Sequence, residues 1–76
     1  MAAKAFVLIE TAVGVTKEVV DALRKLEGVD SVDSVTGSYD IIAVIHRKTM
    51  SDIGDLVTNK IHPIAGISRV VTCLAI

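Results

Sequence analysis

Two segments of this chain follow the same pattern of residue types. They are Leu26-Glu27-Gly28-Val29-Asp30-Ser31-Val32 and Ile64-Ala65-Gly66-Ile67-Ser68-Arg69-Val70, which share an apolar residue, a glycine, a β-branched residue and a valine at equal spacing. In each half of the chain a strand-like run precedes a helix-like run, and this glycine then leads into another strand. Two successive βαβ units predict a ferredoxin-like βαββαβ fold, an α+β sandwich with a four-stranded antiparallel sheet and two helices on one face. Right-handed crossovers place the first and third strands at the centre of the sheet.

The expected strands differ in hydrophobicity. Lys4–Glu10 and Ile41–Arg47 are continuous apolar runs of strand length, which indicates burial on both faces and therefore central positions. The stretch from about Ser31 to Thr36 is short and polar, as is usual at a sheet edge. The last strand is predicted from about Ile67 to Ile76.

Helical periodicity separates these strands in two places. The first helix is expected to begin with Thr16 as its N-cap and to end at Gly28 as its C′ residue. The second is expected to be capped by Thr49 or Ser51 and to stop at Pro63. The apolar positions that repeat with a 3.6-residue period are Val19, Ala22, Leu23 and Leu26 in the first helix and Ile53, Leu56, Val57 and Ile61 in the second.

In this fold both helices cover the same face of the sheet, although the strands are apolar on both faces. Hydrophobic residues make up 51% of the chain and charged residues only 22%, so there is more apolar surface than one small core can hide. A second copy of the chain is the simplest cover for the second face. We therefore predict a sheet-to-sheet dimer, with Val7 and Val44 on the partner-facing side.

Length and charge exclude several classes of function. Seventy-six residues allow a single domain, residues 1–76. The net charge is −1 and the cations are dispersed, so we expect no direct binding of nucleic acid. The apolar runs are too short to span a membrane and the N-terminus lacks a signal-peptide core, so we expect a soluble cytoplasmic protein with no membrane partner. The single cysteine, Cys73, fits a reducing compartment.

A polar turn joins the second and third strands. The segment Val35-Thr36-Gly37-Ser38-Tyr39-Asp40-Ile41 lies between two β-branched runs and predicts a β-hairpin. Its hydroxyls and carboxylate exceed what a turn needs, and Gly37 leaves the backbone open to close approach. Two interpretations stay open: a binding site for a small polar ligand, or a structural turn in which Gly37 has positive φ and Asp40 caps its own backbone as an Asx-turn.

Four segments together resemble the effector-binding RAM domain of the Lrp/AsnC (feast/famine) transcription regulators. They are Phe6-Val7-Leu8-Ile9, Gly28-Val29, Val35-Thr36-Gly37-Ser38-Tyr39-Asp40 and Gly66-Ile67, in that order and spacing. The resemblance covers nearly all of the chain, and its most specific element is the hairpin. In that family a helix-turn-helix domain normally precedes this module. We expect none here, because Met1 lies only a few residues before the first strand, so the chain resembles a stand-alone RAM protein.

The resemblance implies that a free amino acid or similar metabolite binds at an interface between protomers. It assigns ligand binding to the hairpin residues Gly37, Ser38, Tyr39 and Asp40 and to Thr72 in the last strand. Asp40 suits the ammonium group of such a ligand, and the N–H groups around Gly37 and Ser38 suit its carboxylate. Many family members have a second threonine where this chain has Val70. The resemblance also implies dimers assembled into an octamer, and full-length Lrp/AsnC regulators as further partners.

Other functions stay open beside this one. A ferredoxin-like dimeric α/β-barrel enzyme shares the architecture, as does an ACT-type amino-acid sensor, and a third alternative is a pure assembly partner that binds no ligand. A metal site formed by His46, His62 and Cys73 of several protomers is also conceivable. We nevertheless expect no metal, no cofactor and no catalytic residues, because Cys73 lies in an apolar strand and the histidines lie on different elements.

Overall fold

The computed structural model of the protein describes residues 2–76. In chain order its elements are β1 (Ala3–Thr11), α1 (Thr16–Arg24), β2 (Val29–Ser34), β3 (Ile41–Arg47), α2 (Met50–Leu56), the π-helical segment η1 (Val57–Ile61) and β4 (Ile67–Leu74). Because η1 follows α2 directly, the two form one continuous helical segment. The βαββαβ order predicted from the repeated segment is confirmed.

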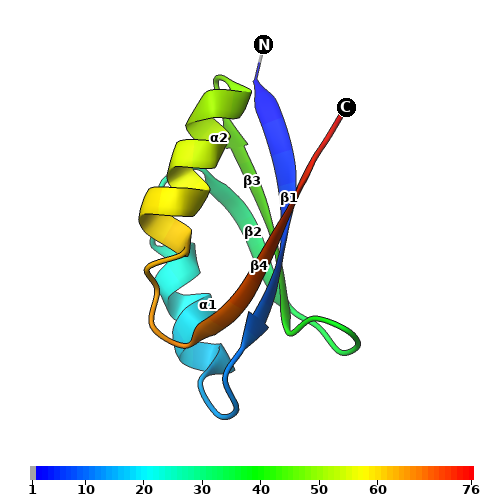
Figure 1. Cartoon of the computed structure of the whole chain (residues 1–76), viewed down its shortest axis with the longest axis vertical. Helices are drawn as coiled ribbons and strands as arrows, with labels where there is room; N and C mark the ends of the chain where they lie inside the picture. Colours follow the sequence, from blue (N-terminus) through cyan, green and yellow to red (C-terminus); the bar gives the residue numbers. More distant parts are fainter. Residues whose placement is uncertain (1) are drawn as a thin grey trace.

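The strands form one antiparallel sheet in the order β2-β3-β1-β4. The predicted central positions of β1 and β3 are therefore confirmed. Val7 in β1 lies opposite Ala43 in β3 and opposite Thr72 in β4. Figure 1 shows both helical segments on the same side of the sheet, which is the result of two right-handed crossovers. We call this side the helix-covered face and the opposite side the uncovered face.

The hydrophobic core lies between the helix-covered face and the helices. Every second residue of β1 and β3 points into it, because side chains alternate along a strand. No polar or charged side chain among residues 2–76 is buried there. Full burial of each large aliphatic side chain stabilises the fold by about 1.5–3 kcal/mol. The buried apolar residues are Ala5, Val7, Ile9, Val19, Val20, Leu23, Val32, Ile41, Ala43, Ile45, Ile53, Leu56, Val57 and Ile61.

The second helical segment agrees closely with its prediction. Thr49 is the N-cap of α2, and its hydroxyl accepts a hydrogen bond of 3.1 Å from the Asp52 N–H. The four predicted core positions, Ile53, Leu56, Val57 and Ile61, are all buried. Helical structure ends at Ile61, two residues before Pro63. The π-helical turns in η1 were not predicted.

The first helix differs from its prediction at both ends. Its N-cap is Val15, with no side-chain capping bond, and Thr16 is the first helical residue. The Thr16 hydroxyl lies 2.7 Å from the Thr11 hydroxyl instead, so it is committed to β1. The helix ends at Arg24, and the N–H groups of the next two residues donate to carbonyls three residues back. This tighter turn brings the chain to Gly28, which is thus not the C′ residue.

The repeated segment forms the same turn twice. Gly28 has φ +92° and Gly66 has φ +97°, values that favour glycine. The Gly28 carbonyl accepts a bond of 2.9 Å from the His46 N–H, and the Gly66 carbonyl accepts one of 2.8 Å from the Ala12 N–H. Each glycine therefore joins a helix exit to the end of a central strand. This early pairing also starts β2 at Val29 rather than at Ser31.

Two glycine substitutions test how tightly the helices and the turns beside them are packed. An added Cβ at Gly66 would lie 2.8 Å from Val15 Cγ2, so Gly66→Ala strains both the backbone and the start of α1. We expect a loss of about 2 kcal/mol or more in the free energy of unfolding. Gly54 lies within α2 and an added Cβ would meet no heavy atom within 4 Å, so Gly54→Ala should stabilise the protein by about 0.5–1 kcal/mol. Thermal unfolding followed by circular dichroism measures both, and changes of the same sign would contradict this packing.

Candidate functional site

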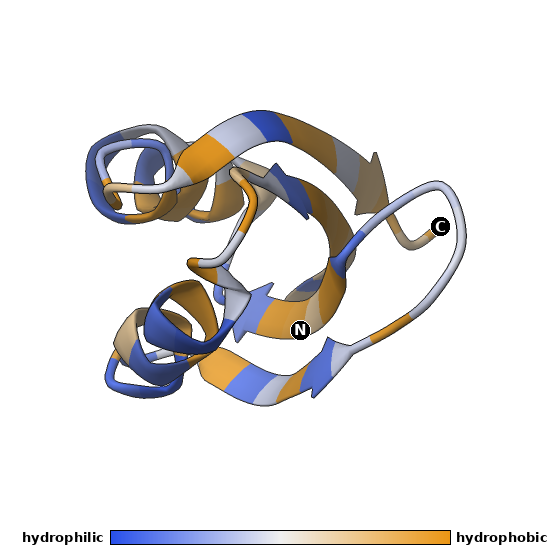
Figure 2. Cartoon of the chain, turned by 90° about the horizontal axis from the view of Figure 1, so that it is seen from below, coloured by the Kyte–Doolittle hydropathy of each residue, from blue (hydrophilic) through white to orange (hydrophobic). Residues whose placement is uncertain are grey.

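The uncovered face of the sheet carries a patch of apolar side chains. Strand register places six of them there: Phe6, Leu8, Ile42, Val44, Val71 and Cys73. Phe6 is 40% exposed, and the Lys4 ammonium lies 5.2 Å from the centre of its ring. Figure 2 shows the apolar colouring of the central strands. An apolar centre of this kind is typical of a surface that a partner covers.

The structure corrects one residue predicted for this face. Val7 is fully buried and lies on the helix-covered face, together with Ala5 and Ile9. The prediction that it faces a partner is wrong, because a continuous apolar run does not reveal which alternate set of side chains meets the helices. Val44 is half-buried and lies opposite Phe6 on the uncovered face, so its contact with a partner stays a prediction.

The hairpin loop between β2 and β3 extends away from both helices, beyond the uncovered face (Figures 1 and 2). It is closed by a bond of 2.9 Å from the Val35 N–H to the Asp40 carbonyl. Thr36, Gly37 and Ser38 are exposed and Tyr39 is half-buried. Gly37 has φ +128°, as the structural interpretation of this turn predicted. The tip therefore presents backbone and hydroxyl groups to the surroundings.

Asp40 connects the hairpin to the body of the domain. One of its carboxylate oxygens, Oδ2, accepts a bond of 2.8 Å from the Thr11 N–H and a longer one of 3.4 Å from the Thr11 hydroxyl. The Asp40 N–H donates to the Ile9 carbonyl at 2.9 Å. The carboxylate thus holds the end of β1, and not its own turn as the Asx-turn interpretation required. Asp40 is half-buried.

Thr72 lies in a groove between α2 and the edge strand β4. Its side chain is exposed and points to the helix-covered side, because it lies opposite the buried Val7. The groove has a volume of about 220 Å³ and is lined by Met50, Ile53, Gly54, Val57, Thr58, Thr72 and Leu74. The Ala75 N–H bonds to the Lys4 carbonyl, and by antiparallel alternation the N–H and C=O of Thr72 then point outward along the free edge.

Within one chain the hairpin and Thr72 are not close together. Asp40 precedes Ala43, the residue in line with Thr72, by three positions, and β1 lies between their strands. These offsets correspond to about 10 Å along the sheet and about 10 Å across it. The hairpin tip also extends toward the uncovered face, whereas Thr72 points to the other side. A single small ligand therefore cannot touch both in the same protomer.

Four further residues line the groove and were not predicted to bind a ligand: Met50, Gly54, Thr58 and Leu74. Gly54 and Thr58 are four residues apart and follow the buried stripe of the second helix at Ile53 and Val57. Helical spacing alone therefore places them beside that stripe. Only the packing of α2 against β4 shows that this flank faces Thr72.

The groups considered for a metal site lie on separate parts of the fold. His46 Nδ1 is 2.6 Å from Asp30 Oδ1, while Cys73 lies farther along the uncovered face and His62 follows η1. Within residues 2–76 of one chain, no three metal-ligating side chains come together. None of the helices in this part of the chain is long and apolar enough to cross a bilayer.

Comparison with known proteins identifies the family. The model of the Lrp/AsnC ligand binding domain matches residues 4–76. The chain belongs to this family. An uncharacterised HTH-type transcriptional regulator of Pyrococcus furiosus is 34% identical over 74 residues, which are 93% of this chain and 49% of that protein. This Lrp/AsnC domain therefore spans about half the length of that relative.

Solved structures share the fold of this chain. A Thermus thermophilus protein matches this Lrp/AsnC domain with a TM-score of 0.93 and 35% identity, over 97% of this chain and 92% of that one. A Neisseria meningitidis transcriptional regulator, solved as a complex with L-Met, matches with a TM-score of 0.87. Its identity is 17%, over 97% of this chain and 49% of that one, so this second likeness is one of fold.

The position of Asp40 in this Lrp/AsnC domain leads to a prediction about stability. Asp40→Ala removes the carboxylate that accepts from the Thr11 N–H, and we expect the free energy of unfolding to fall by about 1.5 kcal/mol without any ligand. Ser38→Ala in the exposed tip is the control and should change it by less than about 0.5 kcal/mol. Urea unfolding measures both. Equal stability of the two variants would show that the Asp40–Thr11 bond contributes nothing.

Proposed function

We propose that this Lrp/AsnC domain binds a free amino acid or similar metabolite at an interface between protomers, where the hairpin of one meets the groove of another. The separation of Thr72 from the hairpin within one chain carries the proposal. Each part offers polar groups that are exposed, and neither encloses a ligand alone. Combined across an interface they supply both ends of a binding site.

The groove has the chemistry of the side-chain end of such a site. Met50, Val57 and Leu74 provide apolar walls, and Thr58 and Thr72 provide hydroxyls. Its volume of about 220 Å³ is below the roughly 300–1,000 Å³ that is usual for pockets of drug-sized ligands. The groove therefore suits one small molecule with a compact apolar part. The outward N–H and C=O of Thr72 add a donor and an acceptor beside it.

The hairpin has the chemistry of the charged end. The exposed backbone around Gly37 and Ser38 suits a carboxylate, and Asp40 suits an ammonium group. Oδ2 of Asp40 already holds Thr11, but a carboxylate has about four lone-pair directions and can accept from a ligand as well. Asp40 then both positions the hairpin and contacts the ligand. The L-Met bound to the Neisseria meningitidis regulator supports an amino acid as the ligand class.

Assembly is the second half of the proposal. The uncovered apolar face suits a second copy of the chain, and dimers of this kind would associate further, as far as an octamer, to bring hairpins to grooves. Mixed assembly with longer regulators is the alternative, favoured by the Pyrococcus furiosus relative of about twice the length. Residues 1–76, with a net charge of −1, act without binding DNA themselves. The family is one of transcription regulators rather than enzymes.

Charge substitutions on the two faces of the sheet test the assembly. Val44→Asp places a carboxylate in the proposed dimer interface, where an unpaired charge costs several kcal/mol, so we expect a folded or partly folded chain of reduced assembly size. Val7→Asp places the carboxylate in the core of each protomer and should abolish folding instead. Light scattering coupled to size exclusion gives the mass, and circular dichroism reports the fold.

Ser51→Asp is the control for this experiment, because Ser51 is exposed on α2. It should keep the wild-type mass. A wild-type mass of 8.0 kDa at micromolar concentration would refute assembly through the uncovered face.

Ligand binding is tested by thermal unfolding in each of the twenty amino acids. A ligand at 100 times its Kd stabilises a protein by about 2.7 kcal/mol, which raises the Tm of a domain this small by about 10–20 °C. Thr72→Val removes one neutral hydroxyl and should weaken binding by about three- to tenfold. Asp40→Ala should weaken it by at least about tenfold, since it removes a charged acceptor.

Ser68→Ala is the matched control for Thr72→Val. Ser68 lies in the same strand as Thr72, is exposed and does not line the groove, so loss of its hydroxyl should leave ligand affinity unchanged. If no amino acid at millimolar concentration shifts the wild-type Tm, the ligand-binding half of the proposal fails and assembly alone is left.

A further inference from the structure

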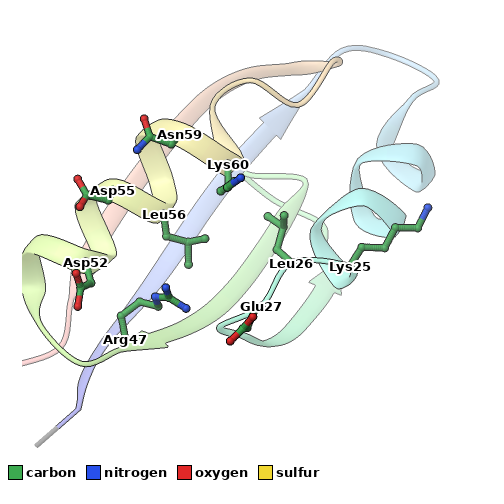
Figure 3. A pocket seen from close by; sticks show the side chains of 9 residues that line it. All are labelled: Lys25, Leu26, Glu27, Arg47, Asp52, Asp55, Leu56, Asn59 and Lys60. Carbon is green, nitrogen blue, oxygen red and sulfur yellow. The ribbon is translucent and has the colours of Figure 1, made fainter.

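A second hollow lies between α2 and the turn that follows α1, at the end of the sheet opposite the hairpin. Its volume is about 470 Å³, within the roughly 300–1,000 Å³ of small-molecule sites. Arg47, the last residue of β3, borders it, whereas the hairpin precedes Ile41 at the start of the same strand. The length of β3 separates the two by about 20 Å. Figure 3 shows the hollow, which we call the Arg47 cleft.

Arg47 is held so that its side chain enters this cleft. A Cβ at Gly28 would lie 3.0 Å from Arg47 Cδ and 3.2 Å from its Nη1, so the arginine passes closely over the glycine backbone. Arg47 is half-buried. Among residues 2–76, basic and acidic side chains approach within 4 Å at Lys17–Asp21 and at His46–Asp30, and Arg47 takes part in neither contact. Its planar fork of donors is therefore available to a carboxylate.

The other residues of the cleft complete a dipolar environment. Leu26 and Leu56 supply the apolar part of the lining. Leu56 points toward Arg47, while Lys25 and Asp55 point away (Figure 3). Arg47 and Lys60 contribute positive charge, and the lining carboxylates of Glu27 and Asp52 contribute negative charge. A simple anion or cation would meet repulsion from one pair. A molecule that carries both charges is attracted by both.

We propose that the Arg47 cleft is a second binding site, contained within one protomer, for a small molecule that carries a carboxylate, an ammonium group and an apolar side chain. Arg47 receives the carboxylate through its guanidinium fork. Asp52, which is half-buried, receives the ammonium group. Leu26 and Leu56 contact the apolar part. Because every group comes from the same chain, this site fills whether or not protomers assemble.

NMR of the ¹⁵N-labelled protein tests the proposal. The twenty free L-amino acids are added in turn at millimolar concentration, and the backbone amide shifts are followed. We expect at least one of them to shift the amides of Glu27, Gly28 and Arg47 in a saturable manner. For the amino acid that binds best, the N-acetyl derivative and the carboxamide each remove one charge and should bind at least about tenfold more weakly.

Arg47→Gln provides the decisive variant, with Arg69→Gln as the matched control. Arg69 is exposed on β4 and does not line the cleft. Arg47→Gln should weaken binding in the cleft at least about tenfold while shifts at residues 36–40 and 70–74 persist, and Arg69→Gln should change neither. Three results would each overturn the proposal. They are shifts confined to residues 36–40 and 70–74, undiminished binding of the two singly charged derivatives, and full cleft binding by Arg47→Gln. If no ligand binds at the proposed interface between protomers, the shifts at Glu27, Gly28 and Arg47 should still occur. The two proposals can therefore fail independently.

Discussion

The two helical segments, α1 and α2–η1, pack against the same face of the sheet, as right-handed crossovers with the strand order β2-β3-β1-β4 require. Side chains of the central strands alternate between the two faces, which buries Val7 under the helices and leaves Phe6 on the other side. The helices therefore bury only one of the two apolar faces of the sheet. In the proposed assembly a second copy of the chain buries the other face. Fold stability and oligomerisation in this Lrp/AsnC domain then depend on the same strands, β1 and β3.

The link from Asp40 through Thr11 to Thr16 has a different role. It joins the start of β3 to the end of β1 and the start of α1 with hydrogen bonds of 2.8 and 2.7 Å. The base of the hairpin is thereby held by three elements, while its tip at Gly37 stays exposed. A projection that is held in one direction loses less conformational entropy when it meets a partner. The same carboxylate thus contributes to the fold and to the proposed recognition.

The α2–η1 segment borders both the groove at Thr72 and the Arg47 cleft. Met50, Gly54 and Thr58 lie along the Thr72 groove, while Asp52, Leu56 and Lys60 lie along the Arg47 cleft. These two sets follow a four-residue spacing on different flanks of one helical segment. A ligand in either place contacts the same wall. If each ligand favoured a slightly different position of this helical segment, binding at one site would change the affinity of the other. The change in affinity would be the same in both directions.

Local patterns in the sequence determined much of this structure. The 3.6-residue period that buries Ile53 and Ile61, and the glycines at 28 and 66 that turn each helix exit into a strand, depend on neighbouring residues and the backbone. The sequence also predicted the hairpin and its resemblance to the Lrp/AsnC family. Tertiary structure alone decided that Val7 faces the helices, that Thr16 bonds to Thr11 instead of capping α1, and that Asp40 holds β1. Each of these depends on which side chain from a distant segment arrives within hydrogen-bonding or packing distance. Periodicity and residue type carry no information about that distance, so the groove at Thr72 and the cleft at Arg47 emerged only from the packed chain.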